Sequence, residues 1–181
     1  MRVGILDIQG DVSEHLEMLK KINVEGVMVR YKKDLDSIDG LIIPGGESTV
    51  IGSILKARGM DKYILDIKIP VMGTCAGLIL ISEKVDDKDG LMPILKISVS
   101  RNAYGTQRES FETDLKINDV GSFRGVFIRA PRIDEVRKGV VLSYFNGKPV
   151  MVKDGRNIGL TFHPEIYGDE RIHKLFVDGL D

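Results

Sequence analysis

The segment PVMGTCAGLILIS, residues 70–82, indicates the fold most clearly, because within it a strand passes directly into a helix. Residues 70–73 form a short apolar run that is typical of a buried strand, and residues 76–82 continue as an apolar helix. Between them, residues 73–77 have the form G-x-C-x-G, the sharp turn that lifts a nucleophile out of a sheet. This order predicts that Cys75 stands between a strand and the N-terminus of a helix.

The first half of the chain repeats this alternation of buried strands and helices. The residues expected in strands are 3–8, 26–30 and 40–43, and those expected in helices are 12–22 and 48–59. Strands that are apolar on both faces and alternate with helices favour a parallel sheet covered by helices.

The second half of the chain has the alternating pattern of antiparallel strands. Such strands are expected at residues 95–99, 111–117 and 149–152, the last flanked by the hairpin turn signals Asn146-Gly147 and Asp154-Gly155. Another strand, residues 157–162, leads into His163, and a helix around residues 172–176 follows. Because no linker or repeat divides the chain, residues 1–181 are expected to form a single α/β domain. Its predicted architecture has three layers: a mostly parallel central sheet with flanking helices and an antiparallel extension.

Composition and charge exclude several classes of function. The 181 residues include 26 Lys and Arg against 27 Asp and Glu, so the net charge of -1 provides no basic surface for nucleic acid or a membrane. Asp7 and Asp11 interrupt the apolar run that a secretory signal would need, which favours a cytoplasmic location. The single cysteine, Cys75, excludes a disulfide within the chain and a multi-cysteine zinc site, and no metal or cofactor is expected.

Cys75 has the surroundings of a catalytic nucleophile. The N-terminus of the helix after it directs backbone N–H groups at the sulfur, which favours the thiolate. The N–H of Ala76 is placed to stabilise an oxyanion at the substrate carbon. A five-residue motif alone leaves open the alternative of a buried structural cysteine.

The segment His163-Pro164-Glu165 supplies the partners that such a nucleophile requires. Residues two apart in an extended chain project to the same side, so Glu165 can accept a hydrogen bond from His163 and fix its tautomer. His163 could then take the proton of Cys75 and deliver it to a leaving amine. A surface histidine at the end of a strand is the alternative. The other two histidines, His15 and His173, are expected to face solvent.

Residues 44–48, Pro-Gly-Gly-Glu-Ser, are expected at the same edge of the sheet as Cys75, because they follow another parallel strand. Their glycines would let a backbone N–H approach a substrate closely, although a plain tight turn is the alternative. Arg101 and Arg129 follow strands and could clamp a substrate carboxylate, unless they are solvated or paired at the surface. The residues together predict a thiol enzyme that hydrolyses a carboxamide.

Three of these segments together resemble the class I glutamine amidotransferases: PGGES at residues 44–48, GTCAGL at residues 73–78 and FHPE at residues 162–165. Four more narrow the resemblance to the glutaminase subunits of pyridoxal 5'-phosphate synthases, and it extends from about Val3 to Phe176. These four segments are LDIQGDVSEH at residues 6–15, RNAYGTQ at residues 101–107, Ser110-Phe111-Glu112 and FIRAP at residues 127–131.

The resemblance implies a catalytic triad of Cys75, His163 and Glu165 that hydrolyses L-glutamine to L-glutamate and ammonia through a thioester on the cysteine. It also implies that the ammonia passes to a synthase subunit, the partner that makes pyridoxal 5'-phosphate in vitamin B6 biosynthesis. The residues that it assigns to glutamine binding are Gly46, Glu47, Ser48, Arg101, Ile128 and Arg129, with Gly46 and Ala76 at the oxyanion hole and Gln9 near the synthase interface.

Two other functions stay open. A glutaminase could serve another synthase, such as that of imidazole glycerol phosphate, but subunits of that kind usually carry Gln shortly after the cysteine, where this chain has Leu78-Ile79-Leu80. The other function is that of a non-catalytic binding or scaffold subunit. The intact set of Cys75, His163 and Glu165 argues against a scaffold.

Overall fold

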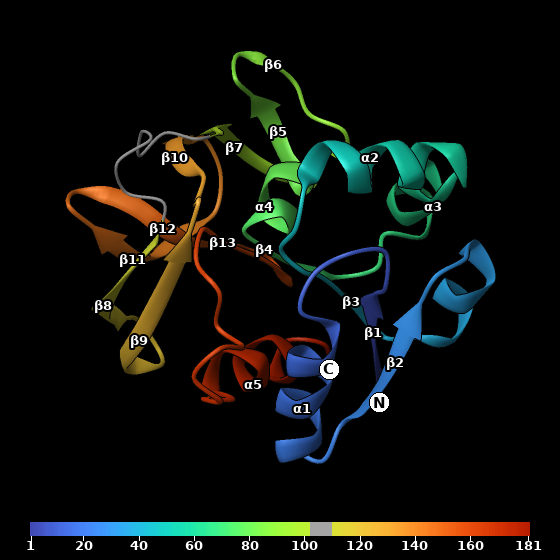
Figure 1. Ribbon diagram of the computed structural model, residues 1–181, viewed down its shortest axis with the longest axis horizontal. Coiled ribbons are helices and arrows are strands. Elements are labelled where there is room, and N and C mark those ends of the chain that lie inside the picture. The colour runs from blue at the N-terminus through green and yellow to red at the C-terminus, as the bar shows by residue number, and fades with distance from the viewer. Residues whose placement is uncertain (102–109) are drawn as a thin grey trace.

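A seven-stranded sheet forms the centre of the protein, in a computed structural model that describes residues 1–101 and 110–181. Its strands are β1 (Arg2–Leu6), β2 (Glu25–Val29), β3 (Gly40–Ile43), β4 (Val71–Thr74), β11 (Val140–Phe145), β12 (Lys148–Asp154) and β13 (Asn157–Leu160). Their order across the sheet is β11-β12-β13-β4-β3-β1-β2 (Figure 1). The five strands from β13 to β2 are parallel. β12 pairs antiparallel with β13, and β11 pairs antiparallel with β12. This arrangement confirms the mostly parallel sheet with an antiparallel extension.

Helices cover both faces of this sheet. They are α1 (Val12–Lys21), α2 (Ser48–Ala57), α3 (Met60–Ile67), α4 (Ala76–Ile81), α5 (Arg171–Asp178) and the short 3-10 helix η1 (Lys32–Ser37). Figure 1 shows α2, α3 and α4 on one side of the sheet and α1 and α5 on the other. Alternation along β3 explains why both faces are apolar: Leu41 and Ile43 pack with α2, α3 and α4, whereas Ile42 packs with α1 and α5. The expected three layers are therefore confirmed.

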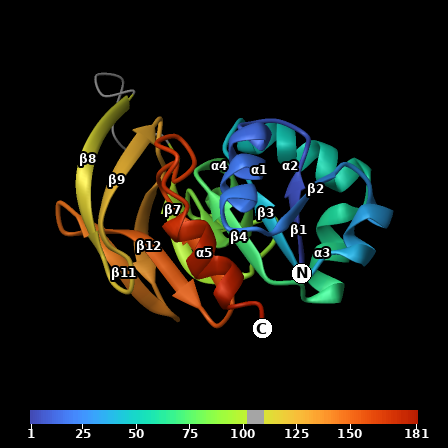
Figure 2. The ribbon, with the colours of Figure 1, turned by 90° about the horizontal axis from the view of Figure 1, so that it is seen from below.

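Two smaller sheets lie beside the central one. The first has the order β10-β7-β5-β6, with β5 (Ser82–Val85), β6 (Lys88–Asp89), β7 (Leu95–Ser100) and β10 (Arg132–Val136). The second is the antiparallel pair of β8 (Ser110–Ile117) and β9 (Gly121–Ile128), which runs along the outer side of the molecule in Figure 2. The strands expected at residues 95–99 and 111–117 thus form, but in these separate sheets. Of the segment of residues 101–107, only Arg101 lies within the described residues.

Candidate active site

Cys75 occupies the sharp turn between β4 and α4. Its backbone has φ 52° and ψ -105°, the strained geometry expected of a nucleophile at the end of a strand. The glycine at position 77 is required by packing, because a Cβ there would lie 1.9 Å from the carbonyl oxygen of Ile43. A Cβ on Gly73 would likewise lie 2.6 Å from the backbone of Gly77. The two glycines therefore let α4 start directly against the sheet, with the thiol at its N-terminus.

His163 and Glu165 follow β13, the parallel neighbour of β4, and form the predicted pair. The Nδ1 of His163 is 2.8 Å from Oε1 of Glu165, and both side chains are buried. Because Nδ1 donates to the carboxylate, Nε2 is the nitrogen left for the thiol of Cys75. Cys75 lies close enough to His163 to be among the groups that raise the pKa of its ring. Glycine at position 45 makes room for the ring, since a Cβ there would meet His163 Cε1 at 2.5 Å.

The charges of the site favour a protonated His163. Burial lowers the pKa of His163, but hydrogen bonds and charge from Cys75 and Glu165 outweigh it and raise this pKa to about 10. Burial raises the pKa of Glu165, and the hydrogen bond from His163 opposes that rise. A protonated His163 beside the carboxylate of Glu165 is therefore the stable arrangement. An imidazolium next to a cysteine generally favours the nucleophilic thiolate.

A cavity of about 940 Å³ opens in front of the sulfur. The residues with predicted roles that line it are Gln9, Gly46, Glu47, Ser48, Cys75, Ala76, Arg101, Ile128, Arg129 and His163. Glu165 is the one residue of the predicted site that does not line the cavity, because it lies buried behind His163. The structure thus brings the predicted residues together around one space large enough for an amino acid.

The two residues predicted to supply the oxyanion hole, Gly46 and Ala76, line the same cavity as Cys75. The Gly46 backbone has φ 130°, a conformation that favours glycine, and the N–H of Glu47 donates to Oε1 of Gln9 at 2.7 Å. Gln9 therefore braces the loop of residues 44–48. Ala76 is the first residue of α4 and follows Cys75 directly, so its N–H has no partner within the helix.

The two predicted arginines differ in their surroundings. The guanidinium of Arg101 donates to Asp86 Oδ2 at 2.8 Å and to Thr49 Oγ1 at 3.3 Å, so an acidic neighbour already holds it at the cavity wall. Arg129 follows Ile128 at the end of β9 with φ 44°, a positive value that is uncommon for a residue with a side chain. The carbonyl oxygen of Ile128 is 3.7 Å from Cys75 Sγ, which places this strand end directly beside the nucleophile.

Comparison with known proteins agrees with this geometry. The family model described as the SNO glutamine amidotransferase family matches residues 5–181. The chain belongs to this family. A pyridoxal 5'-phosphate synthase subunit PdxT of Thermotoga neapolitana is 45% identical and aligns over 98% of both chains. The same subunit of Thermoplasma volcanium is 48% identical over 98% of this chain and 94% of its own. A crystal structure of a glutamine amidotransferase has a TM-score of 0.93 at 39% identity, over 98% of both chains.

The structure of our chain, itself a glutamine amidotransferase, corrects one expectation. His15 and His173 do not face solvent. Both are fully buried, and His15 lies 3.6 Å from the second oxygen of Glu165. The sequence held a signal for this, because His15 continues the apolar face of Val12, Leu16 and Leu19 at helical spacing.

Asp11 is a further residue near His163 for which the sequence predicted no catalytic role. Its Oδ2 is 3.7 Å from Nδ1 of His163. Asp11, His163 and Glu165 offer ligand atoms within 4.8 Å of one another, and such a group could hold a metal ion. A metal there would compete with Glu165 for Nδ1 of His163, so the arrangement is better explained as acid–base pairing.

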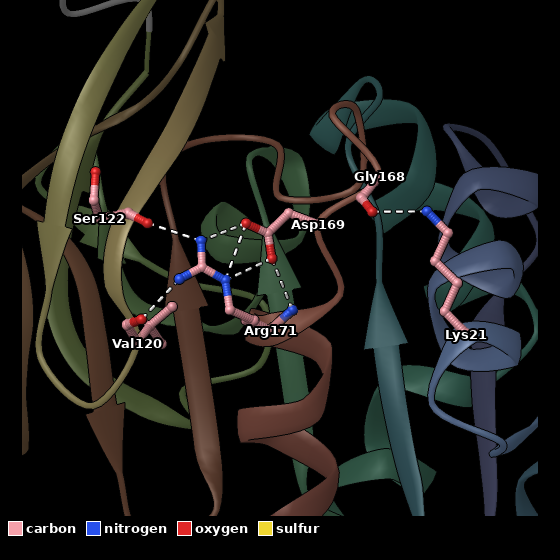
Figure 3. Close-up of polar contacts among 6 residues, drawn as sticks. All are labelled: Lys21, Val120, Ser122, Gly168, Asp169 and Arg171. Carbon is pink, nitrogen blue, oxygen red and sulfur yellow. Dashed lines mark hydrogen bonds and ion pairs between the residues drawn. The ribbon is translucent and has the colours of Figure 1, made fainter.

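Polar contacts anchor the loop that follows Glu165. In Figure 3, the guanidinium of Arg171 donates to the carbonyl oxygens of Val120 and Ser122, at 2.9 and 2.8 Å, and also pairs with Asp169. Lys21 of α1 donates to the carbonyl oxygen of Gly168 at 2.7 Å. These contacts tie the loop to β9 and to α1, and so limit the movement of the segment that carries Glu165.

None of the helices that the structure describes is long and apolar enough to cross a membrane.

Proposed function

We propose that the chain is the glutaminase subunit of a pyridoxal 5'-phosphate synthase, with residues 1–181 as one glutaminase domain. It hydrolyses L-glutamine to L-glutamate and ammonia, and the ammonia passes to the synthase subunit in a hetero-oligomer. The observation that carries this proposal is the buried pair of His163 and Glu165 beside Cys75, at the wall of a cavity of about 940 Å³. The names of the PdxT relatives support the choice of synthase.

The reaction uses Cys75 as nucleophile and His163 as the proton carrier. The thiolate attacks the side-chain amide carbon of glutamine, and the oxyanion that forms accepts hydrogen bonds from the N–H groups of Gly46 and Ala76. His163 gives its Nε2 proton to the amide nitrogen, the C–N bond breaks, and ammonia leaves. Water then attacks the γ-glutamyl thioester while His163 takes its proton, and the thiolate departs to leave glutamate. Glu165 holds the ring in the required tautomer throughout.

The α-amino and α-carboxylate groups of glutamine need partners of opposite charge. Glu47 and Arg101 line the cavity and carry these charges, and Ser48, Ile128 and Arg129 complete the wall. Gln9 braces the loop of residues 44–48, so a synthase that touched Gln9 would also act on the oxyanion site. The chain's lone thiol suits the reducing cytoplasm, where we place the reaction.

Glutamate release with and without the synthase subunit tests this function. The wild-type complex is expected to release glutamate, and Cys75→Ala is expected to lose this activity while it still folds and binds the synthase. A purified Cys75→Ala protein that turned over glutamine would contradict the assignment of the nucleophile. Activity supported by an imidazole glycerol phosphate synthase instead would identify another partner. An absence of glutamate release from the wild-type complex would favour a scaffold.

A further inference from the structure

A pair of buried histidines lies behind the triad and has no role in the mechanism above. His15 in α1 and His173 in α5 are both fully buried, and Nδ1 of His15 is 2.8 Å from Nε2 of His173. Burial of two imidazoles carries a desolvation penalty that two apolar side chains would avoid. The position of the pair therefore requires an explanation beyond packing.

The pair points at the second oxygen of Glu165. Oε1 of Glu165 accepts the hydrogen bond from His163, whereas Oε2 has no hydrogen-bond partner within the described part of the chain. His15 Nε2 also lacks a partner there, and it is 3.6 Å from Oε2. This separation is a few tenths of an ångström longer than a hydrogen bond. Hydrogen bonds of catalytic groups often shorten to their working length as substrate binds.

Both histidine rings are neutral. Burial lowers the pKa of His173 to about 3. Burial, together with His173 and His163, lowers the pKa of His15 well below its usual value. A neutral imidazole carries one N–H, which leaves its other nitrogen as an acceptor.

One arrangement of protons satisfies these neighbours. A carboxylate oxygen can only accept, so the proton of His15 belongs on Nε2, where it faces Glu165. Nδ1 of His15 then accepts from the Nε2–H of His173. Nδ1 of His173, which has no partner among residues 1–101 and 110–181, carries no proton. The orientation of each ring thus fixes the next, from α5 through α1 to the triad.

We propose that His15, held by His173, is a positioning residue of the glutaminase: it donates to Oε2 of Glu165 and keeps that carboxylate charged and turned toward His163. The inference rests on the proposed function, since it concerns the same triad. It also explains why two histidines occupy helix faces that are otherwise apolar. Residues that orient a metal ligand from behind typically change affinity or activity about 10–100-fold when they are replaced, and we expect an effect of that size for His15.

Three substitutions of His15 distinguish a role as hydrogen-bond donor from a role that only fills space. Gln is the matched variant, because its amide nitrogen is the same number of bonds from Cβ as Nε2 of His15. Leu has a similar size but no donor, and Asn is polar but one bond too short to reach Glu165. The glutaminase kcat and KM are measured in the complex with the synthase. The alkylation rate of Cys75 by iodoacetamide at pH 7 is measured on the same proteins, and it reports on a single thiol.

The expected results depend on whether the side chain at position 15 can donate a hydrogen bond to Glu165. His15→Leu and His15→Asn should lower kcat about 10–100-fold with little change in KM, and the alkylation of Cys75 should slow with them. His15→Gln should stay close to wild type in both measurements. Should the Leu variant fail to fold, the comparison of Asn with Gln decides the question, with thermal unfolding measured on each.

Two outcomes would overturn the proposal. One is wild-type kcat and alkylation in the Leu or Asn variant. The other is equal impairment of the Gln and Asn variants, which would mean that His15 only fills space. A wild-type protein that is alkylated but releases no glutamate with the synthase would instead refute the proposed function. The alkylation rates of the variants would still decide the role of His15.

Discussion

Replacing Glu165 by glutamine removes one negative charge from the triad and keeps the size of the side chain. Glu165 Oε1 is 2.8 Å from His163 Nδ1, and burial leaves the pair little screened by solvent. Burial lowers the pKa of His163, yet Cys75 and Glu165 together raise it from 6.5 to about 10. At about 1.36 kcal/mol for each pKa unit, the imidazolium gains about 5 kcal/mol. If Glu165 supplies about half of this, its loss costs about 2–3 kcal/mol, which predicts a decrease in kcat of roughly 30- to 150-fold for Glu165→Gln.

The assay is the initial rate of glutamate release from the synthase complex between pH 6 and pH 9. KM should change by less than about twofold, because Glu165 does not line the cavity. Loss of an interaction that acts only in the transition state lowers kcat instead. Loss of the carboxylate lowers the pKa of His163, so the alkaline limb of the rate should move to lower pH. Glu17→Gln makes the same chemical change at an exposed position of α1 and should behave as wild type. A kcat for Glu165→Gln within twofold of wild type would refute this reasoning.

Three further substitutions test other parts of the molecule. Gly77→Ala should lower the free energy of unfolding by about 1–3 kcal/mol in urea titrations, because its Cβ would lie 1.9 Å from the carbonyl oxygen of Ile43. Gly52→Ala is the control, since its Cβ would meet only the flexible ends of side chains. His173→Gln should make the stability of the protein less sensitive to acid. The pKa of His173 is about 3 in the folded protein against 6.5 as its ordinary value, so the free energy of unfolding falls as pH falls, by about 2 kcal/mol at pH 5. Glutamine does not titrate and avoids this loss. If Tm falls between pH 7 and pH 5 by the same amount in the variant as in the wild type, this prediction is wrong. Arg101→Ala should raise KM for glutamine roughly 10- to 100-fold with a smaller change in kcat, and an unchanged KM would exclude substrate contact.

The elements that carry the site could be predicted because their signals are local. The apolar runs of β3 and β4 and the glycines at positions 73 and 77 are written in consecutive residues, and so is the pairing of His163 with Glu165. Each depends on the geometry of a few neighbouring peptide units, which sequence spacing describes well.

Two features that were not predicted depend on contacts between distant residues. The separation of β7 and β8 into their own sheets follows from pairing with β5, β10 and β9, and alternation along a strand does not specify its partner. The burial of His15 follows from the packing of α1 against α5, some 158 residues later in the chain. A polar residue on an apolar helix face was the one local indication of it.

Strand order explains how residues so far apart in the chain come to line one cavity. β13, β4, β3 and β1 are neighbours and parallel, so their carboxyl ends meet at a single edge of the sheet. His163 follows β13, Cys75 follows β4, residues 44–48 follow β3 and Gln9 follows β1. The next element after β1 is α1, which therefore starts at this edge and packs beside the loop that follows β13. The same topology that assembles the triad thus brings His15 behind Glu165, and a change in the register of β1 would disturb both the support of Glu165 and the bracing of the oxyanion loop by Gln9.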